Sequence, residues 1–495
     1  MTERTASLTH READWAGLRV LVAGLGVSGF AAADALLERG AEVTVVDAHR
    51  PEPGSQQEQR SNILDVLGAT VQLGPGRTNE LPDGAWDLVV TSPGWRPDAP
   101  LLLAAAQQAI PIWGEVELAW RLRPEVGAAP WLTITGTNGK TTTVRMLASM
   151  LTAAGLRTAA VGNVGTPTIE AILNPEPYDV LAVELSSFQL HWSHSLAPLA
   201  SVCLNVAPDH IDWHGSLAAY AQAKGRVYER TQVACVYNVQ DHRTEELVRE
   251  AEVVEGCRAV GFTLGIPAPS MVGLVEDVLA DRAFVDQRAT SAAELATLAD
   301  LVDASGNVAT HNVANALAAA ALARAYGVPP AAVRQGLRTY RPDPHRIAHV
   351  ATSADGVHFV DDSKATNPHA AAAALSAYDS VVWLAGGQLK GADVEDLVRD
   401  AASRLRGVVL LGIDRGRIAA ALARHAPDVP VTEVSDTDTG SMDLAVAAAT
   451  DLAQPGDVVL LAPAAASQDI FANYGARGDA FAEAVRRRLG GTVGD

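Results

Sequence analysis

Residues 135–143 read Thr-Gly-Thr-Asn-Gly-Lys-Thr-Thr-Thr, and this segment has the side chains best suited to phosphate chemistry. An apolar run precedes it and a helix is expected after it, an arrangement in which backbone N–H groups surround a phosphate. We expect Lys140 to neutralise the outer phosphates of a nucleotide and the Thr141 hydroxyl to ligate Mg²⁺. Ile134 stands where the strict motif has its first glycine, so a structural turn is the alternative.

A second glycine-rich segment, with Gly24, Gly26 and Gly29, lies between an apolar run at residues 18–23 and an Ala-rich helix expected at residues 30–39. Asp47 follows the next predicted strand, residues 42–46, where an acid often binds ribose. The pattern predicts a nucleotide diphosphate site, but it does not separate NAD from another nucleotide. A tight turn without a ligand is the alternative.

Three further residues could complete a magnesium site. Glu184 ends the apolar run at residues 181–184, and His210 follows a strand expected at residues 202–206. Mg²⁺ prefers oxygen ligands, which Glu184 supplies directly, whereas an ammonium such as that of Lys224 cannot ligate a metal. From spacing alone, His210 equally fits a structural hydrogen bond and Lys224 a solvated charge.

Polar loops follow predicted apolar strands near the C-terminal end, at residues 361–367, 386–391 and 463–469. In open α/β sheets, ligands bind beyond the carboxyl ends of the strands. These loops could therefore hold a small anionic substrate, and ordinary polar surface loops are the alternative.

The elements that must position these residues form three α/β blocks. We predict a Rossmann-like domain at residues 1–127, a P-loop ATPase-like domain at 128–342 and a doubly wound domain at 343–495. Residues 265–307 show no pattern that places them. The expected elements of the last two blocks are strands at 131–135, 180–184, 201–205, 357–360, 381–385, 408–411 and 458–461, and helices at 141–154 and 312–326.

Composition limits the class of protein. The 495 residues are 48% hydrophobic with a formal net charge of −20, which fits globular domains and argues against a broad nucleic-acid surface. The polar N-terminus and the absence of an apolar run of about 18 to 20 residues predict a cytoplasmic protein without membrane insertion. Cys203, Cys235 and Cys257 have no spacing typical of zinc or of a disulfide framework, so we expect ordinary buried thiols.

Taken together, these segments resemble the Mur ligases, a family of ATP-dependent amide-bond ligases, over almost the whole chain. The family uses a shortened glycine-rich loop, which accounts for Ile134. Gly114-Glu-Val-Glu-Leu118 and Asp362-Ser-Lys-Ala-Thr-Asn367 are similar to the member that adds D-glutamate. The other segments that carry the resemblance are Gly136-Thr-Asn-Gly-Lys-Thr-Thr142, Glu184-Leu-Ser-Ser-Phe-Gln189, Asn205 through Asp209 and His210, and His311-Asn-Val-Ala-Asn315.

The resemblance implies a ligase that adds D-glutamate to UDP-N-acetylmuramoyl-L-alanine through an acyl phosphate, in peptidoglycan precursor synthesis. It also implies ATP, two Mg²⁺ ions and a CO₂-derived carbamate on Lys224, which turns a cation into an oxygen ligand. The partners would be these small molecules, and we expect a monomer. Domain closure is expected, because ATP contacts would come from two domains.

Site residues follow from the resemblance by motif match. The UDP substrate would contact Val27, Ser28, Asp47, Ser92, Gly94, Asn163, Ser186, Gln189 and His210. ATP would contact Gly136, Thr137, Asn138, Gly139, Lys140, Thr141, Thr142, Asn312, Asn315, Arg346 and Asp362. D-Glutamate would contact Lys364, Thr366, Lys390, Ser467, Gln468 and Tyr474. The metal ligands would be Thr141, Glu184, His210 and carbamylated Lys224, and the catalytic residues Lys140, Glu184, His210, Lys224 and Lys364.

Three rival functions stay open at this point. A folylpolyglutamate synthase shares the ATP domain, but the segment from Asp362 and the Rossmann-like first domain argue against it. An NAD-dependent oxidoreductase built on the Gly24 loop would leave the Lys140 loop unexplained. A nucleotide-binding protein without catalysis would bind ATP with no turnover.

Overall fold

The computed structural model describes residues 3–302, 308–341, 344–435, 438 and 440–490. The predicted boundary at residues 342 and 343 and the last part of the unplaced segment, residues 303–307, lie outside the described residues. Two compact units make up the chain, the first from Met1–Val206, His210–Thr297 and Ala314–Thr339 and the second from Ala207–Asp209, Leu298–Val313 and Tyr340–Asp495. In the described parts, no helix has the length and apolar character to cross a membrane.

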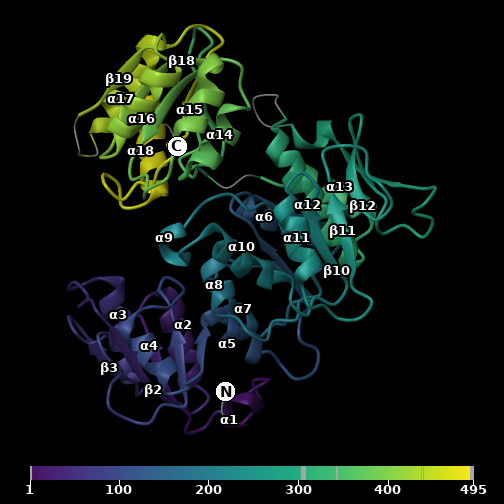
Figure 1. The fold of residues 1–495 in the computed structure, drawn as a ribbon, viewed down its shortest axis with the longest axis vertical. Helices are drawn as coiled ribbons and strands as arrows, with labels where there is room; N and C mark the ends of the chain where they lie inside the picture. The colour runs from purple at the N-terminus through teal and green to yellow at the C-terminus, as the bar shows by residue number, and fades with distance from the viewer. Residues whose placement is uncertain (1–2, 303–307, 342–343, 436–437, 439, 491–495) are drawn as a thin grey trace. The chain divides into compact units, whose positions relative to one another are not determined.

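The first sheet has five parallel strands in the order β3-β2-β1-β4-β5, with helices beside it (Figure 1). Its chain order changes direction at β1, which lies between β2 and β4, so a ligand crevice is expected beyond the ends of β1 and β4. The strands are β1 Arg19–Ala23, β2 Glu42–Asp47, β3 Thr70–Leu73, β4 Leu88–Thr91 and β5 Ile112–Gly114. The helices are α1 Glu3–Ser7, α2 Val27–Leu37, α3 Gln56–Val66, α4 Pro100–Gln107 and α5 Glu115–Arg121.

The central sheet has nine strands in the order β14-β13-β12-β11-β10-β9-β6-β8-β7. Pairing is parallel from β7 to β12 and antiparallel through β13 and β14. The strands are β6 Trp131–Thr135, β7 Thr158–Gly162, β8 Val180–Glu184, β9 Ala200–Cys203, β10 Ala234–Asn238, β11 Arg258–Phe262, β12 Met271–Val275, β13 Val278–Asp281 and β14 Ala293–Thr297. The helices are α6 Lys140–Ala153, α7 Thr168–Ile172, α8 Ser187–His191, α9 Ile211–His214, α10 Leu217–Gly225, η1 Arg226–Tyr228, α11 His242–Glu250, η2 Leu298–Leu301, α12 Thr310–Tyr326 and α13 Pro330–Thr339.

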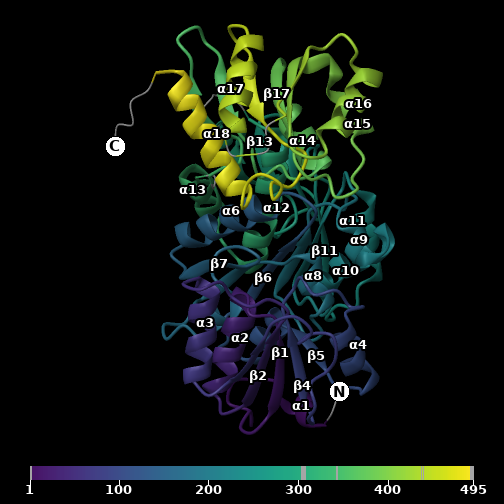
Figure 2. The same ribbon diagram turned by 90° about the vertical axis from the view of Figure 1, so that its left-hand side faces the viewer.

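The third sheet has the order β15-β16-β20-β17-β18-β19 and is parallel except for the β15–β16 pair. Both of its faces are covered by helices, several of which are visible in Figure 2. Val381 and Trp383 of β17 enter one apolar core, while Val382 and Leu384 enter the other, as the alternation of a doubly covered strand requires. The strands are β15 Ala348–Thr352, β16 His358–Asp361, β17 Val381–Gly386, β18 Leu405–Leu411, β19 Val431–Glu433 and β20 Val458–Leu461. The helices are α14 Pro368–Leu375, α15 Glu395–Ala401, η3 Ala402–Arg404, α16 Arg415–His425, α17 Ser441–Leu452 and α18 Tyr474–Arg488.

Three α/β sheets confirm the predicted fold class. The segment that the sequence left unplaced contains β12, which pairs parallel to β11, and β13 and β14, which extend the sheet further by antiparallel pairing. Each strand has only four or five residues, too few for a clear alternation of apolar and polar side chains.

Two buried carboxylates at the start of α5 join the first sheet to the central one. Glu115 accepts a hydrogen bond from the Ile169 N–H at 2.8 Å. Glu117 accepts from the N–H groups of His194 at 2.7 Å and Ser195 at 2.9 Å, and it pairs with Arg121 at 2.6 Å. Burial raises the pKa of Glu115 to about 7. This junction therefore depends on carboxylates that only a few fixed donors stabilise.

Candidate active site

The loop between β6 and α6 has the backbone needed to surround a phosphate. Gly139 caps α6 with a φ of 82°, and a side chain there would collide with the Asn315 amide. At Gly136, φ is 151° and an added Cβ would lie 2.9 Å from the Leu204 Cβ. Both positions therefore require glycine. The structure brings Asn315, an expected ATP residue, against this loop.

Asn205, beyond the end of β9, holds the loop in place. Its Oδ1 accepts from the Asn138 N–H at 2.9 Å, and its Nδ2 donates to the Asn138 carbonyl at 3.2 Å. The Asn205 carbonyl accepts from the Thr137 N–H at 3.0 Å. The loop is thus shaped before any nucleotide arrives, which lowers the cost of binding.

Two lysines converge on the same loop. Lys140 Nζ donates to the carbonyls of Gly136 and Thr137, both at 2.9 Å. Lys224 Nζ donates to the Gly136 carbonyl at 2.8 Å and lies 4.6 Å from the centre of the Tyr220 ring. Lys224 is only 1% exposed, so the alternative of a solvated charge is wrong. The partly buried Lys140 and the buried Lys224 provide, beside this glycine-rich loop, the positive charge that a polyphosphate needs.

Glu184 lies next to this loop because β8 pairs with β6, with Glu184 opposite Ile134. Its Oε1 accepts from the Asn163 amide at 2.9 Å, while its buried Oε2 has no hydrogen-bond partner among the described residues. A buried, unsatisfied carboxylate oxygen is the donor type that Mg²⁺ prefers, so the site fits the metal. Thr141, in the first turn of α6, is also buried.

No group of three or more His, Cys, Asp or Glu side chains within the described ranges is placed to hold a metal ion. Glu184 is therefore not part of such a group, and a Mg²⁺ ion bound to it would need further ligands. Most of the remaining oxygen ligands must come from elsewhere, such as nucleotide phosphates, which is how Mg²⁺ is commonly bound.

His210 caps the short helix α9 in a left-handed conformation, with φ at 52°. Its ring lies 4.8 Å from that of Phe188 in α8. His214, at the other end of α9, contacts Ser187 Oγ at 3.0 Å, and burial and neighbouring positive groups lower its pKa to about 4. Contacts between α8 and α9 thus fix the backbone that carries His210.

The start of α8 gathers two of the expected substrate residues. Ser186 caps the helix and forms a reciprocal capping box with Gln189. Tyr220 of α10 places its hydroxyl 3.1 Å from Thr137 Oγ1, which links the helix that carries Lys224 to the glycine-rich loop. These residues, together with Asn163, Glu184 and His210, lie in the same compact unit as that loop.

The first sheet forms a different glycine-rich site. The α2 helix, which contains Val27 and Ser28, has no side-chain cap at Gly26, so its first N–H groups can meet an anion. Gly24 has a φ of 103°, and a Cβ there would lie 2.6 Å from Ser92 Oγ and 3.1 Å from Trp95 Nε1. The buried Ser92 Oγ has no hydrogen-bond partner in the part of the chain that the structure describes.

Both carboxylate oxygens of Asp47 accept hydrogen bonds from the protein backbone. Its Oδ2 accepts from the Leu25 N–H at 2.9 Å and its Oδ1 from the His49 N–H at 2.9 Å. It therefore fixes the glycine-rich loop, in addition to the ribose contact expected from the sequence. Gly94 is exposed and lies in the same loop as Ser92, beyond the end of β4.

In the second compact unit, the loops beyond β16, β17 and β20 meet around a buried arginine. Arg477 of α18 is 1% exposed and donates to the Ser363 carbonyl at 2.8 Å, to Ser363 Oγ at 3.0 Å and to the Ala465 carbonyl at 3.0 Å. It also reaches the Gly386 carbonyl at 3.5 Å. One guanidinium thus positions all three predicted loops.

The expected D-glutamate residues lie on or beside these loops. Lys364 Nζ lies 5.2 Å from the centre of the Tyr474 ring, and Ser467 is buried. Lys390 is exposed, with a positive φ of 49°. Thr366 is half-buried and Gln468 is exposed.

Asp362 follows β16 and is buried. Burial raises its pKa to about 7, although the nearby Arg346 and the Ile347 N–H favour the charged form. Asn312, Arg346 and Asp362 belong to the second compact unit, whereas the glycine-rich loop and Asn315 belong to the first.

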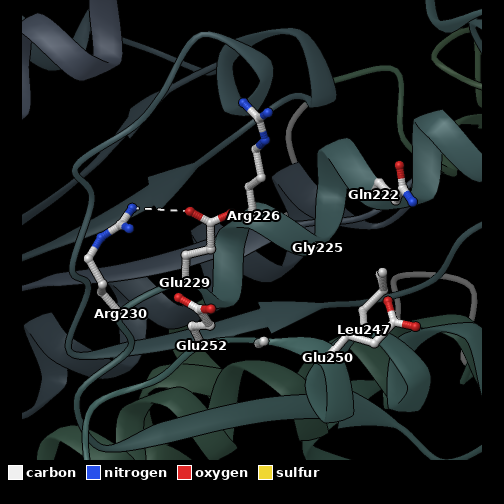
Figure 3. A pocket seen from close by; sticks show the side chains of 9 residues that line it. Gln222, Gly225, Arg226, Glu229, Arg230, Leu247, Glu250 and Glu252 are labelled. Carbon is white, nitrogen blue, oxygen red and sulfur yellow. Dashed lines mark hydrogen bonds and ion pairs between the residues drawn. The ribbon is translucent and has the colours of Figure 1, made fainter. Parts of the chain in front are cut away.

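A separate charged pocket of about 350 Å³ lies between α10, η1 and α11 (Figure 3). Glu229 and Arg230 form an ion pair at 3.1 Å within it, and Arg226 donates to the His191 carbonyl at 2.5 Å. Both arginines therefore already have partners within the protein, and we assign no function to this pocket. Its lining residues are Gln222, Gly225, Arg226, Glu229, Arg230, Leu247, Glu250, Ala251 and Glu252.

The structure adds four residues that the sequence reasoning missed. Asn205 and Tyr220 hold the loop of Lys140, Trp95 lies against Gly24, and Arg477 joins the C-terminal loops. Asn205 was visible only as part of a family segment. Nothing in the sequence distinguishes Arg477 from the exposed arginines that follow it in α18.

Profiles of one protein family match all three regions of the chain. The Mur ligase MurD-like, N-terminal domain matches residues 18–114 and the Mur ligase middle domain matches residues 134–323. The Mur ligase, glutamate ligase domain matches residues 345–465. The matched segments contain the two glycine-rich loops, Glu184, Lys224 and Lys364.

Curated relatives match over nearly the full length. A UDP-N-acetylmuramoylalanine–D-glutamate ligase of Streptomyces avermitilis is 62% identical over 475 residues, which cover 96% of this chain and 99% of the relative. The enzyme of the same name from Thermobifida fusca is 59% identical, covering 96% and 99%. The one from Mycolicibacterium smegmatis is 47% identical, covering 96% and 97%.

Solved structures show the same fold at lower identity. UDP-N-acetylmuramate-alanine ligase MurC of Thermotoga maritima superimposes with a TM-score of 0.56 and 19% identity, covering 95% of this chain and 100% of that one. A pseudomurein peptide ligase type C from Methanothermus fervidus gives 0.55 and 17%, with the same coverage.

Proposed function

The chain belongs to the Mur ligase family, and on this premise we propose how its own residues perform the reaction. The enzyme is an ATP-dependent ligase that adds D-glutamate to UDP-N-acetylmuramoyl-L-alanine in peptidoglycan precursor synthesis. It uses ATP with Mg²⁺ and acts on small-molecule substrates. The roles of individual residues below are our proposal.

The loop of Lys140 binds the phosphates of ATP. The alanyl carboxylate attacks the γ-phosphorus, the bond to the β,γ-bridging oxygen breaks, and ADP leaves with that oxygen. The amine of D-glutamate then attacks the acyl phosphate, an amide forms, and phosphate departs with loss of one amine proton. Lys140 stabilises the charge that develops on the transferring phosphoryl group, and His210 orients it.

Glu184 and the Thr141 hydroxyl hold Mg²⁺, which neutralises phosphate charge when bound. We propose two ions in the active complex. We also propose that Lys224 carries a carbamate, because an ammonium cannot ligate a metal whereas a carbamate supplies the oxygen ligands that Mg²⁺ prefers. Its burial over the Tyr220 ring favours an ordered group, and carbamylation requires the uncharged amine.

The first sheet holds the UDP moiety. N–H groups at the start of α2 donate hydrogen bonds to the diphosphate, with Val27, Ser28, Ser92 and Gly94 around it. Asn163, Ser186, Gln189 and His210 direct the muramoyl-alanine end toward the loop of Lys140. Asn312, Asn315, Arg346 and Asp362 contribute to ATP binding. The enzyme works as a cytoplasmic monomer in this proposal.

D-Glutamate binds at the loops that Arg477 joins. A dicarboxylate needs an anion anchor for each carboxylate, and Lys364 and Lys390 supply positive charge. Thr366, Ser467, Gln468 and Tyr474 supply polar contacts at fixed positions. Inverting the α-carbon moves one charged group from its partner, which costs roughly 3 to 5 kcal/mol if that charge is left buried and unpaired.

The observation that carries this proposal is the convergence of Lys140 and buried Lys224 on the Gly136 carbonyl, beside the unsatisfied oxygen of Glu184. Phosphate release measured with each substrate omitted in turn tests it. Release should require both UDP-N-acetylmuramoyl-L-alanine and D-glutamate, and L-glutamate should be slower by about two to three decades. Equal rates with both enantiomers, or release without an amino acid, would contradict it.

A further inference from the structure

Two of the three cysteines are close neighbours in the fold. The sulfur atoms of Cys235 and Cys257 lie 3.8 Å apart. Cys235 pairs opposite Ala259 in the parallel β10–β11 ladder, and Cys257 stands two residues before Ala259, so the two side chains leave the same face. A disulfide has an S–S distance of about 2.05 Å. The sulfurs therefore need to approach by only roughly 2 Å to bond.

The two thiols differ in exposure and acidity. Cys257 is partly exposed, whereas Cys235 is buried. The pKa of Cys257 is lowered, mainly by its hydrogen bond with Cys235 and also by the charge of Arg258. These effects outweigh its partial burial, which raises the pKa. The same hydrogen bond and burial raise the pKa of Cys235. Cys257 is thus the more accessible and more acidic thiol of the pair, and the buried Cys235 lies next to it.

We propose that Cys235 and Cys257 are a site of reversible oxidation, where hydrogen peroxide converts the pair into an intramolecular disulfide. The Cys257 thiolate attacks one peroxide oxygen, the O–O bond breaks, and a sulfenic acid forms while hydroxide leaves and takes up a proton. The Cys235 sulfur then attacks the sulfenic sulfur, the S–O bond breaks, and water leaves. Two thiols and one peroxide give one disulfide and two waters.

The cross-link would fasten a part of the central sheet that supports the ATP loop from a distance. It ties the start of β10 to the approach of β11 and closes a loop that contains α11. Asn238, the last residue of β10, donates to the Leu204 carbonyl at 2.9 Å, and Asp241, just beyond the strand, accepts from the Val206 N–H at 2.7 Å. Leu204 and Val206 stand on either side of Asn205, which holds the ATP loop. The oxidised protein should therefore resist unfolding more strongly than the reduced protein.

Mass spectrometry and thermal unfolding of the full chain test this site. Hydrogen peroxide should remove two hydrogen atoms from the mass of the monomer, and peptide mapping should join the segments of Cys235 and Cys257. The melting temperature should rise by several degrees, and dithiothreitol should reverse both changes. Cys203→Ala, which removes a buried thiol outside the pair, should keep both responses.

Cys257→Ser should lose both responses while retaining turnover, since neither thiol contacts the ATP loop. In Cys235→Ser, by contrast, oxidation should leave Cys257 as a sulfenic acid or a more oxidised form, without a disulfide. Oxygen added to Cys257 of the wild type while Cys235 stays a thiol, a cross-link between two chains, or a mass loss that persists in Cys257→Ser would each overturn the proposal.

Discussion

The chain uses a strand, a glycine-rich loop and a helix twice, and the two versions differ in charge. The loop before α6 is held by the neutral amide of Asn205 and receives Lys140 and Lys224. The loop before α2 is held by the carboxylate of Asp47, and no lysine or arginine occurs from Gly24 to Gly29. Its spare donors are the N–H groups of α2 and the buried hydroxyl of Ser92.

This difference separates holding a phosphate from transferring one. Backbone N–H groups and a hydroxyl suffice to bind a diphosphate whose bonds stay intact. Transfer of a phosphoryl group develops charge on the transferring group and on the leaving oxygen, and lysines with a metal-binding carboxylate stabilise that charge. The loop before α2, which we call the first loop, therefore suits the UDP moiety. The loop before α6, the second loop, suits ATP, although the two backbones are similar.

Removing the cation at the second loop should have the largest effect. Lys140→Ala should lower turnover by roughly three orders of magnitude, because charge on the transferring phosphoryl group loses its fixed partner. Steady-state phosphate release measures this loss. Arg157→Ala, which removes a partly exposed cation beyond the end of α6, should stay near wild type. Normal turnover in Lys140→Ala would exclude this residue from the chemistry.

Lys224→Ala should lose about a hundredfold in turnover through removal of the proposed oxygen ligand. Short carboxylic acids should partly restore the rate, since a carboxylate fits the vacated space and ligates Mg²⁺. Gln222→Ala, on the same helix, is the control and should need no rescue. Full activity of Lys224→Ala without additives would rule out the carbamate.

At the first loop, Ser92→Ala should raise the KM for the UDP substrate up to about tenfold and leave the KM for ATP unchanged. The reason is the loss of one hydrogen bond, about 0.5 to 1.5 kcal/mol. Ser55→Ala removes a helix-capping serine from the same domain and serves as the control in the same kinetic experiment. A matching rise in the KM for ATP would show that the two loops are not independent.

The sequence predicted both loops because each depends on neighbours in the chain. Strands 131–135 and 180–184 were predicted with their exact ends, since fully buried parallel strands are continuous apolar runs. The pairs Asn138–Asn205 and Cys235–Cys257 were not predicted, since contacts between distant segments leave no periodic signal. Arg477 was missed because its burial depends on three loops that converge only in the folded chain.

The junction between the two loop-bearing sheets should affect the stability of the fold and its dependence on pH. The pKa of Glu115 is raised from 4.5 to about 7 by burial, with the charge of Glu170 contributing, so the folded state keeps a proton that the unfolded chain releases. Stability should therefore fall as pH rises from 4.5 to about 7, by at most roughly 3 kcal/mol.

Glu115→Gln should remove this loss, because an amide does not ionise and can still accept from the Ile169 N–H. Thermal unfolding at pH 5 and pH 8 should show the variant gaining several degrees relative to wild type at the higher pH. Glu38→Gln, at an exposed carboxylate, should follow wild type. If Glu115→Gln had the same melting temperature as wild type at both pH 5 and pH 8, Glu115 would not be the group whose ionisation lowers stability.

Calorimetric titration of UDP and of a non-hydrolysable ATP analogue into two variants tests the division between the loops most directly. Lys140→Ala should lose affinity for the ATP analogue and bind UDP like wild type, because the cation belongs to the second loop alone. Ser92→Ala should bind the ATP analogue normally and UDP more weakly. Loss of UDP binding in Lys140→Ala, or of ATP-analogue binding in Ser92→Ala, would contradict the account.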